Sequence, residues 1–256
     1  MIELTITDDV AHVVLDAPGR RNALDERALA ELDAAYDEAA RAGVRALLLR
    51  GDGPAFCAGR DISGVDPATD DVTGYLDGLV TPLLRKMSAF PAPTFAAAHG
   101  ACLGVGLGLL IATDVVYVAD TAKIGSPFAM LGATLDSGGH ALFYERLGAH
   151  RTLDLVYTGR LMSGTEAVTA GLFSQSFPAT DLRAATEEAA AAAASGATRA
   201  FLASKRLIAR LRDERLALWD AVTAENADQA ALRDTDDYRE GFAAFQEKRR
   251  PRFTGR

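Results

Sequence analysis

The chain has 256 residues, and 49% of them are hydrophobic, which is enough to bury one substantial core. Its 27 basic and 35 acidic residues give a net charge of -8, which argues against general nucleic-acid binding because phosphate backbones call for a basic surface. The two cysteines, Cys57 and Cys102, make neither a disulfide framework nor a metal site, and they are typical of a reducing cytoplasmic setting.

Neither the first sixteen residues nor the longest uncharged stretch of the chain predicts membrane insertion. Residues 1–16 lack the basic start and long apolar run of a signal peptide. Residues 87–113 are uncharged, but Pro91, Pro93 and several glycines interrupt them, so they are a poor membrane helix. We therefore expect a cytoplasmic protein.

The first ninety residues alternate between strand and helix patterns. Two β-branched stretches on either side of Asp8 and Asp9 predict a hairpin. A helix with one apolar side follows and stops at Gly43. A short apolar strand leads into a glycine-rich loop, and a second helix ends before Pro91. The predicted segments are strands 2–7, 10–15 and 44–51 and helices 24–41 and 74–89.

The same alternation continues to about residue 177. A buried strand feeds a glycine-spaced turn and a short helix, two more strands follow, and short helices occupy the next fifty residues. The predicted strands are 94–100, 115–120, 122–125 and 172–177, and the predicted helices are a short one within 101–114 and three at 139–147, 150–158 and 164–171.

The last third of the chain contains strong helix formers and almost no strand signal, in residues 181–211 and 214–232. The sequence thus predicts an α/β core over residues 1–190 and a helical segment over residues 191–256 that packs on its own core or on a neighbouring subunit. The last nine residues, KRRPRFTGR, form either a solvated tail or a local basic site for an anion.

Two glycine-rich loops each follow a predicted strand: GDGPAFCAGRD over residues 51–61 and HGACLGVGLG over residues 99–108. Glycine lets a ligand approach the main chain, and a helix N-terminus offers free N–H groups. Two such loops side by side can aim two donors at one oxygen and stabilise an enolate or a tetrahedral oxyanion. The glycine spacing does not fit a dinucleotide fingerprint, and phosphate-loop and serine-elbow motifs are absent. Glycines that serve only tight packing remain an alternative.

Several stretches in order along the chain resemble the enoyl-CoA hydratase/isomerase (crotonase) family: GRRNALD, GDGPAFCAGRDI, HGACLGVGLGLLIATDVVYVADTAKIG, GRLMSGTEAVTAGL and EGFAAFQEKRRPRFTG. The resemblance implies a crotonase-like ββα spiral core and a C-terminal α-helical oligomerisation segment. It also implies an acyl-CoA thioester as substrate, no further cofactor, no metal, and a homotrimer or dimer of trimers.

The resemblance also assigns site residues by position. The oxyanion hole would use the main-chain N–H groups of Arg60 and Val105, where any side chain is tolerated. The stretch RRNAL and the basic end of the chain would contact CoA. The implied CoA-binding residues are Arg21, Ala23, Asp61 and Lys248.

The sequence departs from the family hydratases at the two acids that place and activate water. The first falls on Gly108 and the second on Phe128, and neither side chain ionises. Without these carboxylates nothing holds the water or moves its proton, so we expect poor hydratase activity.

Asp136 is the one charged residue in FAMLGATLDSGGHALF, residues 128–143. It falls on another acid position of the family, the one used by the ring-epoxyphenylacetyl-CoA isomerase type, dienoyl-CoA isomerases and 4-chlorobenzoyl-CoA dehalogenases. An N-cap role for the helix that follows is the competing interpretation. His140, four residues further, would either lie on the surface or support Asp136.

The leading hypothesis is an enoyl-CoA isomerase-like enzyme in which Asp136 moves a proton while the two N–H groups hold an enolate. Three alternatives stay open: a hydratase with an atypical site, a hydrolase or dehalogenase with Asp136 as nucleophile, and a catalytically silent acyl-CoA-binding protein.

Overall fold

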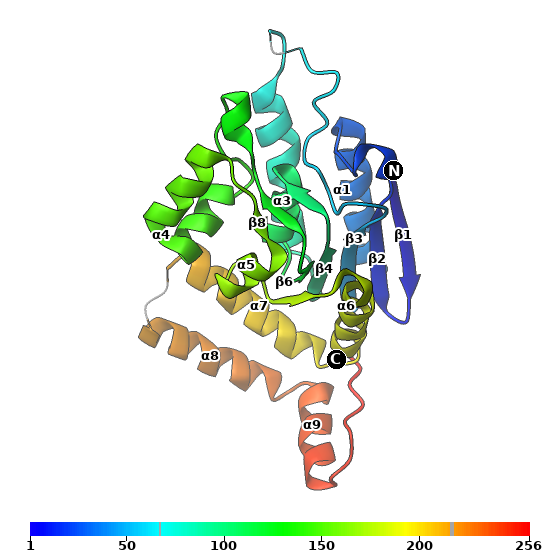
Figure 1. Cartoon of the computed structure of the whole chain (residues 1–256). Helices are drawn as coiled ribbons and strands as arrows, with labels where there is room; N and C mark the ends of the chain where they lie inside the picture. Colours follow the sequence, from blue (N-terminus) through cyan, green and yellow to red (C-terminus); the bar gives the residue numbers. More distant parts are fainter. Residues whose placement is uncertain (67, 216–217) are drawn as a thin grey trace.

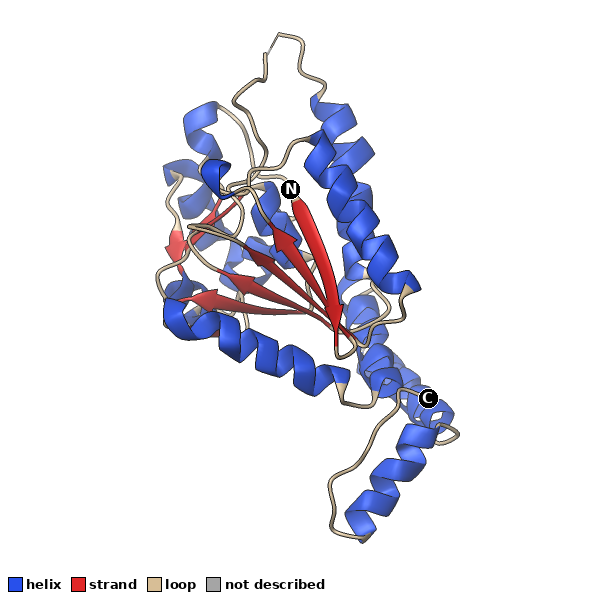
Figure 2. Cartoon of the chain, turned by 90° about the vertical axis from the view of Figure 1, so that its right-hand side faces the viewer, coloured by secondary structure: helices blue, strands red, loops and turns tan. Residues whose placement is uncertain are grey.

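The computed structural model describes residues 1–66, 68–215 and 218–256, and its larger sheet is a twisted fan of strands (Figure 2). β1 and β2 form the predicted hairpin across Asp8 and Asp9, and every other neighbouring pair is parallel. The strand order is β1 (Ile2–Thr7), β2 (Val10–Leu15), β3 (Ala46–Gly51), β4 (Thr94–Ala98), β6 (Val115–Ala119) and β9 (Gln175–Phe177).

A second, smaller sheet gives the chain its spiral course. It contains β5 (Ala101–Leu103), β7 (Lys123–Gly125) and β8 (Met162–Ser163). β4 of the large sheet is followed by β5 of the small sheet and then by helix α3 (Val105–Ile111). β6 is followed in the same way by β7, a short 3-10 turn η3 (Phe128–Leu131) and helix α4 (Gly139–Thr158). These two turns of the chain are therefore ββα units, as predicted.

Helices α1 (Glu26–Arg41) and α2 (Thr81–Ser88) pack together beside the sheet (Figure 1). α1 begins two residues later than predicted because the Asp25 carboxylate caps it by accepting a hydrogen bond of 2.8 Å from the Ala28 N–H. The helix predicted for residues 74–89 is confirmed, but its first half is not α-helical. A π-helix, η2 (Gly74–Val80), precedes α2 and turns Tyr75 and Val80 into the core.

The two helices predicted over residues 139–158 are joined in α4, but the chain breaks helical geometry between them. Gly148 has φ 76° and ψ 172°, values that are not helical. The Thr152 hydroxyl donates a hydrogen bond of 2.8 Å to the freed Gly148 carbonyl. The predicted break therefore lies at Gly148. Helix α5 (Gly164–Thr169) follows, with the Ser163 hydroxyl and the Glu166 carboxylate forming a capping box.

Helix α6 (Ala179–Ala194) ends with a run of six alanines, residues 189–194, and lies across β3, β4 and β6. Its buried side chains recur every four residues, which is the spacing of one helix face: Leu182, Thr186, Ala190 and Ala194. The division predicted at residues 190 and 191 falls inside this helix. In the structure, the part of the chain that leaves the sheet begins with α7 (Thr198–Asp213).

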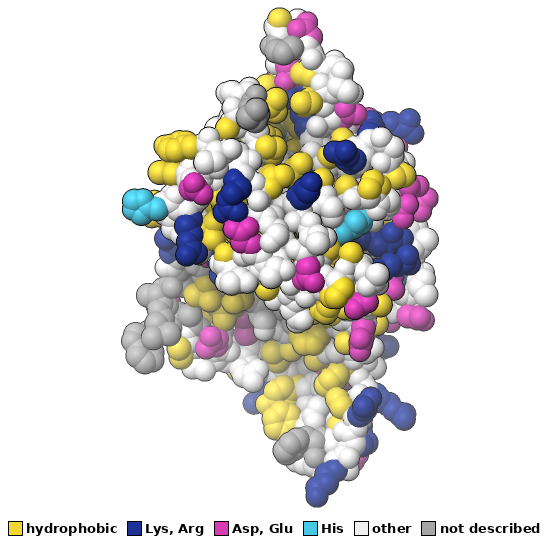
Figure 3. Space-filling view, in the orientation of Figure 1, with side chains coloured by type: hydrophobic (Ala, Val, Ile, Leu, Met, Phe, Trp, Pro, Cys, Tyr) yellow, Lys and Arg dark blue, Asp and Glu magenta, His cyan; other side chains and the backbone are white. Residues whose placement is uncertain are grey.

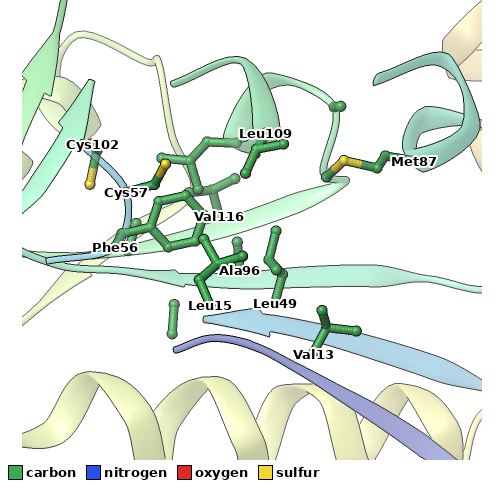
Figure 4. Packing of buried hydrophobic residues seen from close by; sticks show 14 of the residues in the cluster. Val13, Leu15, Leu49, Phe56, Cys57, Met87, Ala96, Cys102, Leu109 and Val116 are labelled. Atoms are coloured by element: carbon green, nitrogen blue, oxygen red, sulfur yellow. The ribbon is translucent and has the colours of Figure 1, made fainter. Parts of the chain in front are cut away.

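The main core lies between the large sheet and the loops and helices above it (Figure 4). Leu15 and Leu49 rise from β2 and β3 toward Phe56 of the first glycine-rich loop. Leu109 of α3 reaches the same layer, and all four side chains are at most 1% exposed. Burial of several such side chains, each contributing about 1.5–3 kcal/mol, fixes the first loop and α3 to one rigid layer.

Helix α7 runs along the core, where the Lys205 ammonium donates to the Ala92 carbonyl at 3.2 Å. Helices α8 (Leu218–Leu232) and α9 (Asp236–Gln246) lie beyond it at the bottom of Figure 1. Residues 216 and 217 of the predicted helix 214–232 lie outside the described residues. The Arg45 guanidinium ties the end of the chain to the core through the Thr198 hydroxyl and the Phe253 carbonyl, each at 3.1 Å. In the part of the chain that the structure describes, no helix is long and apolar enough to cross a membrane.

Candidate active site

The RRNAL stretch runs alongside the first glycine-rich loop and fixes its course. The Ala58 N–H donates to the Arg21 carbonyl at 3.0 Å, and the Leu24 N–H donates to the Gly59 carbonyl at 2.8 Å. The Asp61 N–H returns a hydrogen bond of 2.9 Å to the Leu24 carbonyl. The main chain of Leu24 therefore forms hydrogen bonds with the residues on both sides of Arg60.

The Asn22 side chain also holds the first glycine-rich loop in place through hydrogen bonds. Its side chain is fully buried, and its amide nitrogen donates to the carbonyls of Ala55 and Phe56 at 2.8 and 3.2 Å. Its amide oxygen accepts a hydrogen bond of 2.8 Å from the Ala17 N–H. A buried amide with these partners cannot shift without leaving polar groups unpaired, so the first loop is held rigidly.

The two glycine-rich loops lie side by side, as the sequence predicts. Cys57 and Cys102 pair in a parallel bridge, in which the Cys57 N–H donates to the Ala101 carbonyl at 2.9 Å. Two residues further, Gly59 has φ 95°, and a Cβ atom there would lie 2.9 Å from the Leu103 carbonyl oxygen. Only glycine permits this contact and this conformation together.

Gly59 and Gly104 lie next to each other, since a Cβ atom on Gly59 would lie 3.7 Å from the Gly104 Cα, and Arg60 and Val105 directly follow them on the two loops. The Gly59 carbonyl, which accepts from Leu24, belongs to the same trans peptide group as the Arg60 N–H, so the Arg60 N–H points away from Leu24. Val105 is the first residue of α3, where an N–H has no acceptor within the helix. Among the described residues, neither the Arg60 nor the Val105 N–H has an acceptor.

The segment from η3 to the start of α4 contacts α3 at three points. The Phe128 ring lies against Gly104, where a Cβ atom would come within 3.0 Å of the Phe128 Cζ. Ser137 lies against Gly108 one turn further, and Gly138 lies against Ile111. Asp136 is therefore placed beside the first turns of the helix that provides the Val105 N–H.

Asp136 does not cap α4. Gly138 occupies the N-cap position, and no side chain caps this helix. Ser137 and Gly138 have φ values of 51° and 90°, and these two left-handed residues turn the Asp136 side chain away from the helix axis. The N-cap interpretation is therefore wrong.

The Asp136 carboxylate is a half-buried acid that has no hydrogen-bond partner among the described residues. Its Oδ1 atom is buried and, like the Ser137 hydroxyl, makes no hydrogen bond within the described residues. Burial raises the pKa of Asp136 above its ordinary value. The Ser137 hydroxyl, which lies beside it outside hydrogen-bonding geometry, and the positive charge of Arg60 oppose this shift without reversing it.

The positions of the two hydratase acids are occupied differently here. A Cβ atom on Gly108 would lie 2.5 Å from the Ser137 Cβ and 3.1 Å from the Ser137 carbonyl oxygen. A glutamate at this position would therefore collide with the segment that carries Asp136. Phe128 fills the second position with a ring that packs on Gly104.

The predicted CoA-binding residues fall into two groups. Arg21, Ala23 and Asp61 lie together along the first loop, where the Arg20 guanidinium also binds the Asp61 carboxylate at 2.9 Å. Lys248 follows α9, at the end of the molecule opposite to the loop between β3 and η2 (Figure 1). Within one chain Lys248 does not join the other three. His140 is exposed, and its Nε2 atom contacts the Thr134 hydroxyl at 3.3 Å instead of the Asp136 carboxylate.

Two residues that the sequence did not single out also lie at the site. The Arg60 guanidinium forms two hydrogen bonds with Asp70 and stacks over the Tyr75 ring. Both partners belong to the stretch 62–82, which precedes α2 and has no pattern that would predict these contacts.

The surface around these groups is partly apolar. Figure 3 shows hydrophobic side chains gathered in the upper part of this face, below the projecting loop between β3 and η2. Ile62, Val72 and Leu131 are among the exposed large apolar residues of these segments.

Two cavities of about 840 and 360 Å³ lie among the C-terminal helices and tail, and neither contains a predicted site residue. The candidate site is therefore located by its reactive groups and not by cavity volume. In the described residues no cluster could hold a metal ion.

Known proteins share this combination of ββα turns, two loops with free main-chain N–H groups, and one half-buried acid. The enoyl-CoA hydratase/isomerase family model matches residues 5–256. The chain is 32% identical to a putative enoyl-CoA hydratase/isomerase, YhaR, of Bacillus subtilis, over 95% of each chain. It is 33% identical to a probable enoyl-CoA hydratase of Rhodobacter capsulatus, over 100% of this chain and 98% of the relative.

Solved structures agree with this assignment. The crystal structure of a putative enoyl-CoA hydratase/isomerase from Mycobacterium abscessus superposes with a TM-score of 0.91 at 30% identity over the whole of both chains. The chain belongs to the enoyl-CoA hydratase/isomerase family. The crotonase-like fold predicted from the sequence is thereby confirmed.

Proposed function

We propose that this enzyme shifts a carbon–carbon double bond along the acyl chain of an enoyl-CoA thioester. The thioester oxygen accepts hydrogen bonds from the main-chain N–H groups of Arg60 and Val105. Neither donor has an acceptor among the described residues, and the two follow neighbouring glycines on adjacent loops, which supports their assignment as the oxyanion hole.

In this mechanism Asp136 acts as both base and acid. Its carboxylate removes a proton from C2 of a 3-enoyl thioester, and the negative charge moves to the thioester oxygen as a dienolate. The same carboxyl group then returns the proton at C4, which leaves a 2-enoyl thioester. One group suffices for this 1,3-shift, and the raised pKa of Asp136 makes it a stronger base than an exposed aspartate.

One observation carries the proposal: the site has a single unpaired carboxylate and lacks the two acids that hydration uses. Many of the relatives' names read hydratase, and those names set the competing expectation. Hydration needs a second group to hold and activate water, and Gly108 and Phe128 supply none.

A screen of the wild-type enzyme with thioesters tests this function. We expect turnover of 3-enoyl-CoA to 2-enoyl-CoA, with hydration of crotonyl-CoA slower by at least about 10²-fold, the usual contribution of one acid–base group. Hydration at the isomerisation rate would overturn the proposal. Release of free CoA, or a trapped acyl-enzyme, would instead indicate a hydrolase or dehalogenase with Asp136 as nucleophile. Binding without turnover of any thioester would indicate a silent acyl-CoA-binding protein.

We further propose that Arg21, Ala23 and Asp61 line the path of CoA in one subunit and that Lys248 approaches CoA bound to a neighbouring subunit in a trimer or dimer of trimers. The exposure of large apolar side chains supports such an assembly: Tyr144 (63%), Tyr157 (74%), Ile208 (64%) and Phe242 (55%). Light scattering is expected to give a mass three or six times that of the 27.0 kDa chain. A monomer at micromolar concentration would contradict this expectation.

A further inference from the structure

The side chain of Arg60 is fixed on two sides. Its Nη1 and Nη2 atoms bond Asp70 Oδ2 and Oδ1 at 2.8 and 2.6 Å. Its guanidinium carbon lies 4.1 Å from the centroid of the Tyr75 ring. The side chains of Arg60 and Asp70 are only 22% and 14% exposed. A planar guanidinium that is both paired twice and stacked has one orientation.

Tyr75 connects this side chain back to the main chain of Arg60. The Tyr75 hydroxyl donates a hydrogen bond of 3.2 Å to the Leu24 carbonyl. That carbonyl also accepts the Asp61 N–H, and the Leu24 N–H donates to Gly59. The contacts therefore form a closed ring that runs from the Arg60 guanidinium through Tyr75 and Leu24 to the peptide groups on either side of Arg60.

We propose that Asp70 and Tyr75 are positioning residues that brace Arg60, so that its main-chain N–H is held for the thioester oxygen and its partly neutralised charge is held beside Asp136. This inference rests on the proposed function, in which Asp136 moves the proton. The family resemblance assigns a role to the main-chain N–H of Arg60 and none to its side chain. The inference therefore adds the Arg60 side chain and its two partners, Asp70 and Tyr75, to the site.

The charges around Asp136 make Arg60 the group that adjusts its proton affinity. Among the charged side chains that the structure describes, Arg60 lowers the pKa of Asp136 by its positive charge. Tyr75 lies close enough to interact with Asp136, but burial keeps its hydroxyl neutral. α3 has no titratable side chain, and on α2 Lys86 is paired with Asp33 and Asp37. On α4 the nearest titratable groups are exposed: His140, Tyr144 and Glu145.

Two substitutions should move the pKa of Asp136 in opposite directions. Asp70→Asn leaves the Arg60 charge uncompensated, so the pKa of Asp136 should fall. Arg60→Met keeps the main-chain N–H but removes the charge, so the pKa should rise. We expect each shift to be about one pH unit, the lower end of the effect of a nearby opposite charge. The measurement is a titration of carbon-13-labelled aspartate carboxyl groups by NMR, with the signal missing in Asp136→Asn as the assignment.

A third variant tests the positioning itself. Tyr75→Phe keeps the ring under the guanidinium but loses the hydrogen bond to Leu24. Because one such bond contributes about 1 kcal/mol, kcat should fall about 2- to 10-fold. The KM for the thioester should stay within about twofold, since a group that holds a transition-state donor acts on kcat. The pKa of Asp136 should not move in this variant.

The outcomes separate the brace from the proposed function. Carboxyl titrations that stay unchanged, or move in the same direction in Asp70→Asn and Arg60→Met, would overturn the brace whatever the enzyme catalyses. An unaltered kcat in Tyr75→Phe would remove Tyr75 from it. A wild-type enzyme that isomerises no thioester would refute the proposed function, and the titrations, which need no turnover, would then decide on the brace alone.

Discussion

Asp136→Asn is expected to lower kcat for the conversion of 3-enoyl-CoA to 2-enoyl-CoA by at least about 10²-fold and to leave substrate binding largely intact. Asparagine has the same shape but cannot take a proton from C2. The loss should also appear in a measurement that does not depend on completed turnover, because exchange of the C2 hydrogens with deuterated solvent requires the same base. If exchange persisted at the wild-type rate in Asp136→Asn, another group would be the base.

The matched control is Glu145→Gln, which neutralises an exposed carboxylate on α4, nine residues further along the chain. It should isomerise the thioester at the wild-type rate, because its side chain is 54% exposed to solvent and belongs to no group of the site. A comparable loss in both variants would show that the effect is a general one of charge on α4 rather than of a base at position 136.

The stability of Asp136→Asn provides a second control. Burial raises the pKa of Asp136 in the folded protein above its unfolded value, so ionisation of this group costs stability as the pH rises from the unfolded to the folded pKa. Asparagine avoids that cost. At pH 7 the variant should be more stable by about 1 kcal/mol, the lower end for a buried unpaired group. This corresponds to a rise in Tm of about 2–4 °C. The gain should vanish below about pH 4, where both states of the wild type are protonated.

The sequence predicts most of the fold because its signals are local and repeated. Alternating apolar residues mark the hairpin of β1 and β2, and glycine marks the end of α1 and the break at Gly148. The π-helix η2 was not predicted, because its extra residue per turn leaves an apolar pattern that looks like an ordinary helix over seven residues.

The site is predictable only in part, for a different reason. The glycine-rich loops indicate main-chain amides that can bind a ligand, and the lone charge of Asp136 indicates a candidate acid. The N-cap interpretation failed because the left-handed backbone of Ser137 cannot be read from its residue type. The contacts of Arg60 with Asp70 and Tyr75 join side chains from an irregular loop and a π-helix, whose spacing follows no period. Such contacts depend on the tertiary path of the chain and emerge only from coordinates.

The second large effect is expected at Gly104, which sets the direction of the Val105 N–H. Gly104 has φ 52° and ψ -120°, a conformation that essentially only glycine adopts. Its own N–H donates to the Gly125 carbonyl at 3.2 Å, so the residue is tied to the small sheet on one side and opens α3 on the other. A Cβ atom here would lie 3.0 Å from the Phe128 Cζ and 3.9 Å from the Gly59 Cα. Alanine therefore forces either a change of backbone angles or a displacement of the aromatic ring.

Gly104→Ala should accordingly lower kcat by about 10²- to 10³-fold, the loss that follows removal of one oxyanion donor. The strain should also destabilise the fold by about 1–3 kcal/mol. Gly43→Ala is the matched control, because Gly43 has φ 68° and open space around it but lies at the end of α1. It should lose stability to a similar strain and keep its kcat. Equal loss of stability in the two variants with loss of kcat only at Gly104 would separate the direction of one amide from strain in general. Full activity in Gly104→Ala would mean that the Val105 N–H does not hold the thioester oxygen.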